Sequence, residues 1–154
     1  MSTHEYRLIA STKSPEDLVR HDSVDVSLYN DPALFEAELE KIFYRTWVWV
    51  AHESEVRNAG DFKTATIGRR PVIVVRDKKN TINVLENRCR HRGATVCEKH
   101  KGNATGFTCP YHSWSYGLDG KLRALPYPDG YEGVLEKSDL PLTSLRVESY
   151  AGMI

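Results

Sequence analysis

Four residues arranged as two Cys–His pairs constrain this chain more than any other feature of its sequence. Cys89 and His91 form a Cys-x-His pair, and Cys109 and His112 form a Cys-x-x-His pair further along the chain. Each pair borders short segments that are typical of strands, so we expect each to lie in a tight turn at a strand end. Two such turns, facing each other, can hold a metal centre with two thiolates and two imidazoles.

Two kinds of metal centre suit this ligand set: a single zinc ion and a 2Fe–2S cluster. Zinc modules usually take both cysteines of a turn as a Cys-x-x-Cys pair, whereas each turn here supplies one Cys and one His. A cluster with both cysteines on one iron and both histidines on the other requires that division. Neutral imidazoles also leave the cluster less negative than four thiolates do, so that it accepts an electron more readily. The pattern therefore favours iron.

Composition predicts one domain of a reducing compartment. The chain has 154 residues and equal numbers of basic and acidic side chains, 21 of each. A chain of that length suits a single compact domain, and a balanced charge gives no field that would attract nucleic acid or a membrane surface. The N-terminus lacks an apolar segment of signal-peptide length, so we expect a cytoplasmic protein. Three cysteines make a disulfide framework a poor expectation there.

The order of the predicted elements is an arm, one helix and then strands. Residues 1–28 are polar and predict an arm without sustained structure. Residues 29–47 predict a helix, because Asn30 or Asp31 can cap it and Pro32 suits its first turn. Its apolar positions recur with helical spacing, and we expect them to form one face. They are Phe35, Leu39, Ile42 and Phe43.

Short β-branched and aromatic segments follow the helix and predict a small antiparallel β domain. The Asp119–Gly120 pair predicts a two-residue hairpin turn, Asp77–Asn80 predict another turn, and residues 126–141 a long surface loop. The final strand ends without a cap or polar tail, so we expect the chain to be the front part of a longer polypeptide. The predicted strands are residues 47–52, 61–67, 71–77, 81–87 and 144–154.

The segment "NRCRHRGATVCEKHKGNATGFTCPYHSWSYGLDGKLRALP" resembles the Rieske domain of the large (alpha) subunit of ring-hydroxylating oxygenases. The resemblance extends upstream through "WVWVAHESEV" and "GDFKTATIGRRPVIVVRD", and covers residues 28 to 154. It implies a mainly β fold: a Rieske domain at 29–154, preceded by one helix, with a cluster-binding subdomain whose loops lie at about 87–93 and 107–116. It also implies that Cys89 and Cys109 bind one iron of the 2Fe–2S cluster and that His91 and His112 bind the other, with His112 on the route by which an electron leaves.

By the same resemblance the domain transfers electrons to the mononuclear iron of an oxygenase that acts in aromatic hydrocarbon catabolism. We expect that iron in a C-terminal catalytic domain beyond residue 154, because the remaining histidines show no spacing for a two-histidine, one-carboxylate site. The implied partners are a ferredoxin or reductase as electron donor and other oxygenase subunits in a homo-oligomer. A free-standing Rieske-type ferredoxin is the second interpretation, and a structural zinc module is the third. The substrate cannot be read from these residues.

Three positions depart from the pattern of high-potential Rieske proteins or of the oxygenases. Tyr111 stands where the respiratory proteins have a bridging cysteine, and Trp114 stands where they have a serine donor. Both changes predict a low-potential centre, near roughly −150 mV. Ser113 replaces the glycine that usually follows the second histidine, so either the backbone tolerates a side chain there or its hydroxyl alters the hydrogen bonding.

The residues around the ligands have simpler expected roles. Arg92, Ser113 and Trp114 are candidates for contact with the ligands, and Tyr116 is as plausible beside the cluster as in the core. Arg90 is by default a solvated charge. We expect Cys97 to be a buried free thiol, His100 a solvated turn residue and His52 a packing residue. The aromatic residues Tyr44, Trp47 and Trp49 predict part of the core.

Overall fold

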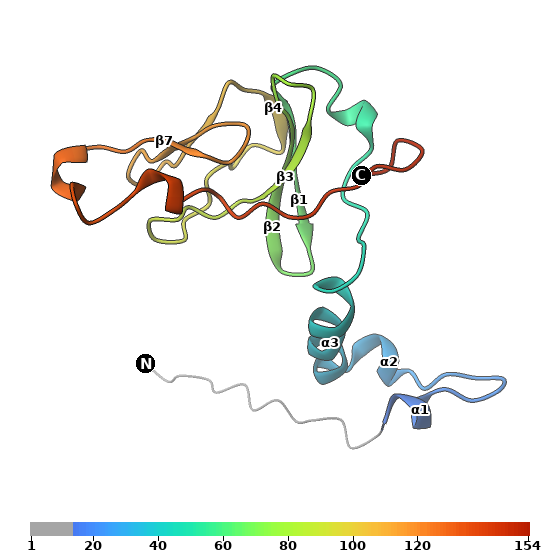
Figure 1. Ribbon diagram of the computed structural model, residues 1–154. Helices are drawn as coiled ribbons and strands as arrows, with labels where there is room; N and C mark the ends of the chain where they lie inside the picture. The colour runs from blue at the N-terminus through green and yellow to red at the C-terminus, as the bar shows by residue number, and fades with distance from the viewer. Residues whose placement is uncertain (1–13) are drawn as a thin grey trace. The chain divides into compact units, whose positions relative to one another are not determined.

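The computed structural model describes residues 14–154, drawn in colour in Figure 1. The first part of the predicted arm, residues 1–13, lies outside the described residues. Two compact units make up the chain and divide between Trp47 and Val48. No helix of residues 14–154 has the length and apolar character needed to span a membrane.

The first unit is helical. The short helix α1 (Pro15–Leu18) falls within the predicted arm, which therefore contains a helical turn, and α2 (Ser27–Asn30) spans the predicted boundary between arm and helix. The helix α3 (Pro32–Glu38) continues as a π-helical turn, η1 (Leu39–Phe43). The carboxylate of Asp31 accepts hydrogen bonds from the backbone N–H groups of Ala33 and Leu34, at 2.7 and 3.3 Å, and so caps α3. The predicted helix is therefore confirmed from Pro32 to Phe43.

The predicted apolar face of this helix is only partly buried. Leu39 is buried, whereas Phe35 and Ile42 are 40% and 49% exposed. The π-helical turn lies across this stretch and changes the angular spacing of the residues that follow it.

A four-stranded antiparallel sheet forms the centre of the second unit, with strand order β3-β2-β1-β4 (Figure 1). Its strands are β1 (Asp61–Ile67), β2 (Arg70–Arg76), β3 (Ile82–Glu86) and β4 (Lys101–Asn103). The central strand β2 is buried on both faces, because alternate side chains point to opposite sides of the sheet and both sides are covered.

A three-stranded antiparallel sheet, with order β5-β6-β7, carries the second Cys–His pair between its first two strands. Its strands are β5 (Phe107–Thr108), β6 (Ser115–Tyr116) and β7 (Leu122–Ala124). The mainly β, antiparallel fold predicted from the sequence is confirmed. The long loop at 126–141 contains two short 3₁₀ turns, η3 (Pro128–Tyr131) and η4 (Lys137–Asp139), and no strand.

The two sheets share one apolar core, and both cysteines of the Cys–His pairs lie in it. Ile73 and Val75 of β2 belong to the same buried cluster as Phe107 and Leu122 of the smaller sheet. Cys89 and Cys109 are buried in this cluster too. A separate apolar cluster covers the other face of β2, where Val72 and Val74 pack with Ala51, Val56, Val84 and Ile154.

Both predicted turns are present, and one differs in length. Asp77 and Asn80 close the β2–β3 turn, where the N–H of Asn80 donates to the carbonyl of Asp77 at 3.1 Å. The β6–β7 connection contains Asp119 and Gly120 but runs over five residues, 117–121, instead of two. The N–H of Gly117 donates to the carbonyl of Lys121 at 2.9 Å, so the two sides of the turn stay hydrogen-bonded around residues 118–120, and a register shift lies at 115/116.

The strands predicted at 47–52 and 144–154 are wrong as strands. Both segments are extended, but they pair mainly through isolated contacts: the N–H of Val50 donates to the carbonyl of Ile154, and Ser144 bridges to Leu85 of β3. Ala151 and Gly152 adopt positive φ, which turns the chain back and ends any ladder.

The predicted core role of two tryptophans is also wrong. Trp47 is 61% exposed and Trp49 is 64% exposed, because 47–52 does not join a covered sheet. Tyr44 is half-buried. His52 is exposed, and its Nδ1 accepts a hydrogen bond from the N–H of Ser54 at 3.2 Å, so it caps the short 3₁₀ turn η2 (Glu53–Glu55) instead of packing in a core.

Candidate metal centre

The two loops that carry the Cys–His pairs have the same backbone hydrogen bonds. The N–H of Cys89 donates to the carbonyl of Ala94 at 2.8 Å, and the N–H of Gly93 donates to the carbonyl of Cys89 at 2.9 Å. In the second loop, the N–H of Cys109 donates to the carbonyl of Trp114 at 2.9 Å, and the N–H of Ser113 donates to the carbonyl of Cys109 at 3.0 Å. Each cysteine is therefore fixed at the start of a closed turn.

The histidine occupies a different place in each turn. It lies two residues after the cysteine in the first loop and three residues after it in the second. The fourth residue after each cysteine has positive φ, 75° at Gly93 and 57° at Ser113. Ser113 thus adopts the left-handed conformation that explains why glycine suits this position. The first of the two alternatives raised by the sequence, a backbone that tolerates a side chain, is what the structure shows.

The side chain of Asn87 holds the first loop in place through hydrogen bonds to its backbone. Its amide is buried, its Oδ1 accepts from the N–H groups of Val96 and Cys97 at 3.0 and 2.8 Å, and its Nδ2 donates to the carbonyl of Cys97 at 2.7 Å. A buried amide that satisfies three backbone groups holds both ends of the loop together. The sequence analysis did not single out Asn87. A polar residue directly after a strand and two positions before a candidate ligand was the available signal.

The two histidine rings lie against each other. The ring centroids of His91 and His112 are 4.6 Å apart with the planes nearly perpendicular, at 80°. Trp114 is buried and stacks on His91, with centroids 5.0 Å apart and an interplanar angle of 15°. The ring of Tyr111 lies 3.9 Å from that of His112, and the guanidinium of Arg92 lies 5.5 Å from the Tyr111 ring. These contacts fix the orientation of both imidazoles.

A tyrosine hydroxyl lies beside the cysteines. The Oη of Tyr116 is 3.3 Å from the Sγ of Cys89 and accepts a hydrogen bond from the N–H of Arg90 at 3.0 Å. Burial, followed by the contact with Cys89, raises the pKa of Tyr116 above its usual value. The hydroxyl therefore keeps its proton and, because its oxygen already accepts from Arg90, can donate to the sulfur.

The surroundings of His91 favour its neutral form. Burial first, and then the positive charges of His112 and Arg92, lower the pKa of His91. A neutral imidazole has a ring nitrogen with a free lone pair, which is the form that binds a metal.

The donor set fits a metal cluster. Nδ1 of His112 is buried and has no hydrogen-bond partner among the described residues. A buried ring nitrogen without such a partner is costly unless a metal or another group takes that role. A cluster with two irons asks for two protein ligands on each, which two Cys–His pairs provide.

The other predicted residues lie outside this set. Cys97 is a buried free thiol, as expected, and burial raises its pKa. His100 is exposed at a bend, which confirms its expected solvated position. Arg90 is exposed while its backbone N–H binds Tyr116, so it has both a solvated charge and a structural contact.

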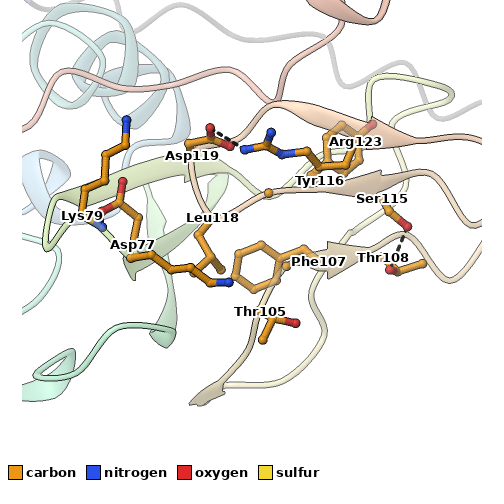
Figure 2. Close-up of a pocket in the computed structure, with 13 residues that line it drawn as sticks. Asp77, Lys79, Thr105, Phe107, Thr108, Ser115, Tyr116, Leu118, Asp119 and Arg123 are labelled. Atoms are coloured by element: carbon orange, nitrogen blue, oxygen red, sulfur yellow. Dashed lines mark hydrogen bonds and ion pairs between the residues drawn. The ribbon is translucent and has the colours of Figure 1, made fainter.

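A cavity of about 550 Å³ is lined by Tyr116, by Thr108 and Ser115 at the base of the second loop, and by the β2–β3 turn. Figure 2 shows the strands of the smaller sheet and the β2–β3 turn around it, with the Asp119–Arg123 ion pair at one edge and the Thr108–Ser115 hydrogen bond at another. None of the residues that line it is a cysteine or a histidine. The candidate chemistry of the chain is therefore in the two loops.

Comparison with known proteins identifies the fold and the family. The sequence matches the family described as the Rieske [2Fe-2S] domain over residues 46–150. The chain belongs to the Rieske family. Its cofactor is accordingly a 2Fe–2S cluster, and the predicted zinc module is excluded as its identity.

The relatives of this Rieske domain are oxygenases. Biphenyl 2,3-dioxygenase subunit alpha of Rhodococcus jostii (strain RHA1) is 44% identical over 135 residues, which are 88% of this chain and 29% of the relative. The crystal structure of naphthalene 1,2-dioxygenase from Rhodococcus sp. is 40% identical with a TM-score of 0.80, and the match covers 84% of this chain and 30% of that one. The predicted resemblance to the Rieske domain of oxygenase alpha subunits is confirmed.

A further solved relative has a different named activity. The structure of a quaternary ammonium Rieske monooxygenase is 34% identical with a TM-score of 0.76, over 82% of this chain and 37% of that one. This Rieske chain spans about three tenths of the length of the curated relatives that it matches.

Proposed function

We propose that Cys89, His91, Cys109 and His112 ligate the 2Fe–2S cluster and that the chain is the electron-transfer domain of a ring-hydroxylating oxygenase. One observation carries the ligand assignment: two loops with the same backbone frame bring two buried cysteines to the core and two imidazoles into contact, and one buried imidazole nitrogen has no other partner among the described residues.

Each group in the site has a role that follows from its position. Bound there, a 2Fe–2S cluster supplies a centre that accepts and returns one electron. Cys89 and Cys109 lie in the apolar core, which keeps water from the sulfur side. His91 and His112 are half-buried, so they mark the side from which an acceptor can be approached. Trp114 holds the ring of His91, and Tyr116 donates to the sulfur of Cys89.

The relatives support the remainder of the proposal. They are named as alpha or large subunits, so they belong to enzymes with further subunits. For this chain we infer a protein of the same kind: an oxygenase with its mononuclear iron in the remaining part of the polypeptide, a ferredoxin or reductase as electron donor, and assembly with other copies. The three free cysteines suit the reducing cytoplasm that we propose as its location.

The observation that would separate this function from a free-standing Rieske ferredoxin is electron delivery to an oxygenase iron. The polypeptide extended to the length of the relatives should form hydroxylated product with an aromatic substrate, a reductant and oxygen. A full-length product of the gene that ends near residue 154 would support the ferredoxin instead.

The ligand assignment is tested by metal analysis. Protein prepared without oxygen should contain iron and acid-labile sulfide in equal amounts, and His91→Ala or His112→Ala should lose the cluster spectrum. Cys97→Ser is the matched control, because Cys97 is a buried thiol of the same core, and His100, which follows it by three residues, is exposed at a bend. Stoichiometric zinc without sulfide, or loss of the cluster in the Cys97 variant alone, would contradict the assignment.

A further inference from the structure

A second cavity of about 550 Å³ forms a charged groove beside the first cluster loop. Arg90 of that loop forms one wall, and Lys121 and Arg123 at β7 form another. The η4 turn, with Lys137 and Asp139, and the segment 141–144 complete it. Among the described residues that line the groove there is no histidine, so an occupant does not have to cover His91 or His112.

The groove carries a surplus of positive charge that the chain as a whole does not have. Four cationic side chains and two carboxylates line it, a surplus of two positive charges, while the whole chain has a net charge of zero. Asp119 is already bound to Arg123, at 2.8 Å. Within residues 14–154, no carboxylate lies within ion-pair distance of Arg90, Lys121 or Lys137. These three cations are therefore available to an acidic partner.

The wall of the groove is directly connected to the candidate ligands. Arg90 stands between Cys89 and His91 in the sequence, and its N–H binds the hydroxyl of Tyr116, which contacts the Sγ of Cys89. A partner seated on Arg90 is therefore one residue from each of two ligands. The histidine side stays accessible, so a donor and an acceptor can use different faces of the same domain.

The composition of the groove suits a partner that must leave after each encounter. The two leucines that line it, Leu122 and Leu142, are themselves buried, whereas Lys121 and Lys137 are exposed. Electron-transfer complexes have small interfaces, and opposite charges raise the rate of encounter without a large buried apolar contact. A small groove with exposed cations on its walls matches that kind of contact better than a permanent interface.

We propose that this groove is the docking site for the acidic surface of a one-electron donor protein. The inference rests on the proposed electron-transfer function and adds the place and the charge of the partner. One electron passes in each encounter: the donor is oxidised and this chain is reduced, with no bond formed and no atom transferred.

The test reverses charge on two exposed lysines of the groove that lie outside the cluster loops. The variant Lys121→Glu/Lys137→Glu and the parent chain are mixed rapidly with a reduced plant-type 2Fe–2S ferredoxin, whose potential lies below that of His-ligated clusters and can drive the reaction. At low salt the second-order rate of reduction should fall about ten-fold or more, because steering by opposite charge is lost. The difference should shrink towards 1 M salt, where the screening length is about 3 Å.

Lys78→Glu/Lys79→Glu is the matched control. It changes the net charge by the same amount, and both lysines line the cavity of Figure 2 instead of the groove. The control should keep the parent's rate within about two-fold. Lys121→Gln/Lys137→Gln should give an intermediate rate. All variants should keep the visible spectrum and midpoint potential of the parent, which shows that the cluster is intact.

The outcomes distinguish the two proposals. Equal loss of rate in the groove variant and the control, or loss in the control alone, would overturn the docking site while leaving the electron-transfer function in place. A parent protein with an iron–sulfur cluster that no ferredoxin reduces would overturn the proposed function, and the docking site with it.

Discussion

Ser113 occupies in the second cluster loop the position that Gly93 occupies in the first. Each is the fourth residue after a cysteine, each N–H donates to the carbonyl of that cysteine, and each has positive φ. The two loops are therefore one backbone frame used twice, with the histidine moved by one residue. At Ser113 this frame is strained, because in the left-handed region the Cβ of a non-glycine residue lies too close to a backbone carbonyl oxygen.

Replacing Ser113 by Gly should stabilise the protein by about 1 kcal/mol, since glycine removes the strain of a left-handed residue. Urea unfolding of the two proteins measures the difference, and Gly93→Ser is the reciprocal control, expected to destabilise by a similar amount. Ser113 is exposed and its hydroxyl has no hydrogen bond within residues 14–154, so the midpoint potential should not change. A shift in potential, or a less stable Gly variant, would show that the hydroxyl acts on the cluster.

Tyr116→Phe should lower the midpoint potential. The Oη of Tyr116 lies 3.3 Å from the Sγ of Cys89, and because a thiolate ligand carries no proton, the hydroxyl would be the donor to it. A donor to a ligand sulfur stabilises the reduced, more negative state. A hydrogen bond of about 1 kcal/mol that acts mainly on the reduced state corresponds to a shift on the order of 50 mV. This contact was not part of the argument for a potential near roughly −150 mV, and it moves the expected value upward.

Redox titration with an optical or electron-paramagnetic signal measures this shift. Tyr111→Phe is the control, because the ring that contacts His112 is kept and no hydrogen bond of the Tyr111 hydroxyl is present within residues 14–154. If both variants shift the potential equally, the effect is not specific to the Cys89 contact.

Asn87→Ala should destabilise the first cluster loop. It leaves the N–H groups of Val96 and Cys97 and the carbonyl of Cys97 without their partner in a buried place, at a cost of about 3 kcal/mol or more. We expect a lower urea midpoint and faster loss of the visible cluster spectrum on warming. Asn83→Ala is the control, since the side-chain hydrogen bond that Asn83 makes within residues 14–154, to Asp77, is long at 3.4 Å. An equal fall in the urea midpoint for Asn87→Ala and Asn83→Ala would contradict the proposal that Asn87 stabilises the first cluster loop.

The thiol of Cys97 predicts a dependence of stability on alkaline pH. Burial raises its pKa, so the folded protein keeps the neutral thiol after the unfolded chain has begun to ionise. This contribution is complete below the unfolded pKa of about 8.5 and is lost as the pH rises through the folded value. Urea unfolding at pH 7 and pH 9.5 should show a larger decline for the parent than for Cys97→Ala. Identical declines would show that other groups cause it.

The sequence predicted the ligands as types and spacings because a Cys–His pair in a turn is a local feature. Three other features are local in the same sense, because neighbouring residues determine them. A capping residue starts the helix at Asp31, a turn residue closes the turn at 77–80, and β-branched runs form the antiparallel strands. Those predictions agree with the structure wherever neighbouring residues decide the conformation.

The errors fall where distant segments decide. The pattern of 47–52 is that of a buried strand, yet Trp47 and Trp49 are exposed, because burial depends on which segment covers them and not on their own residues. The register shift at 115/116 likewise exists only in the pairing of β6 with β7. The sequence of neighbouring residues predicts neither the exposure of the two tryptophans nor the irregular pairing of β6 with β7.

The sequence by itself determined which residues can bind a metal, and in what order they occur along the chain. Only the tertiary structure brought Cys89 and Cys109 into one core, placed Trp114 against His91 and brought the Tyr116 hydroxyl to a sulfur 27 residues earlier in the chain. The reason is physical: hydrogen bonds and ring contacts act over a few ångströms, and packing of the two sheets, not sequence separation, sets those distances.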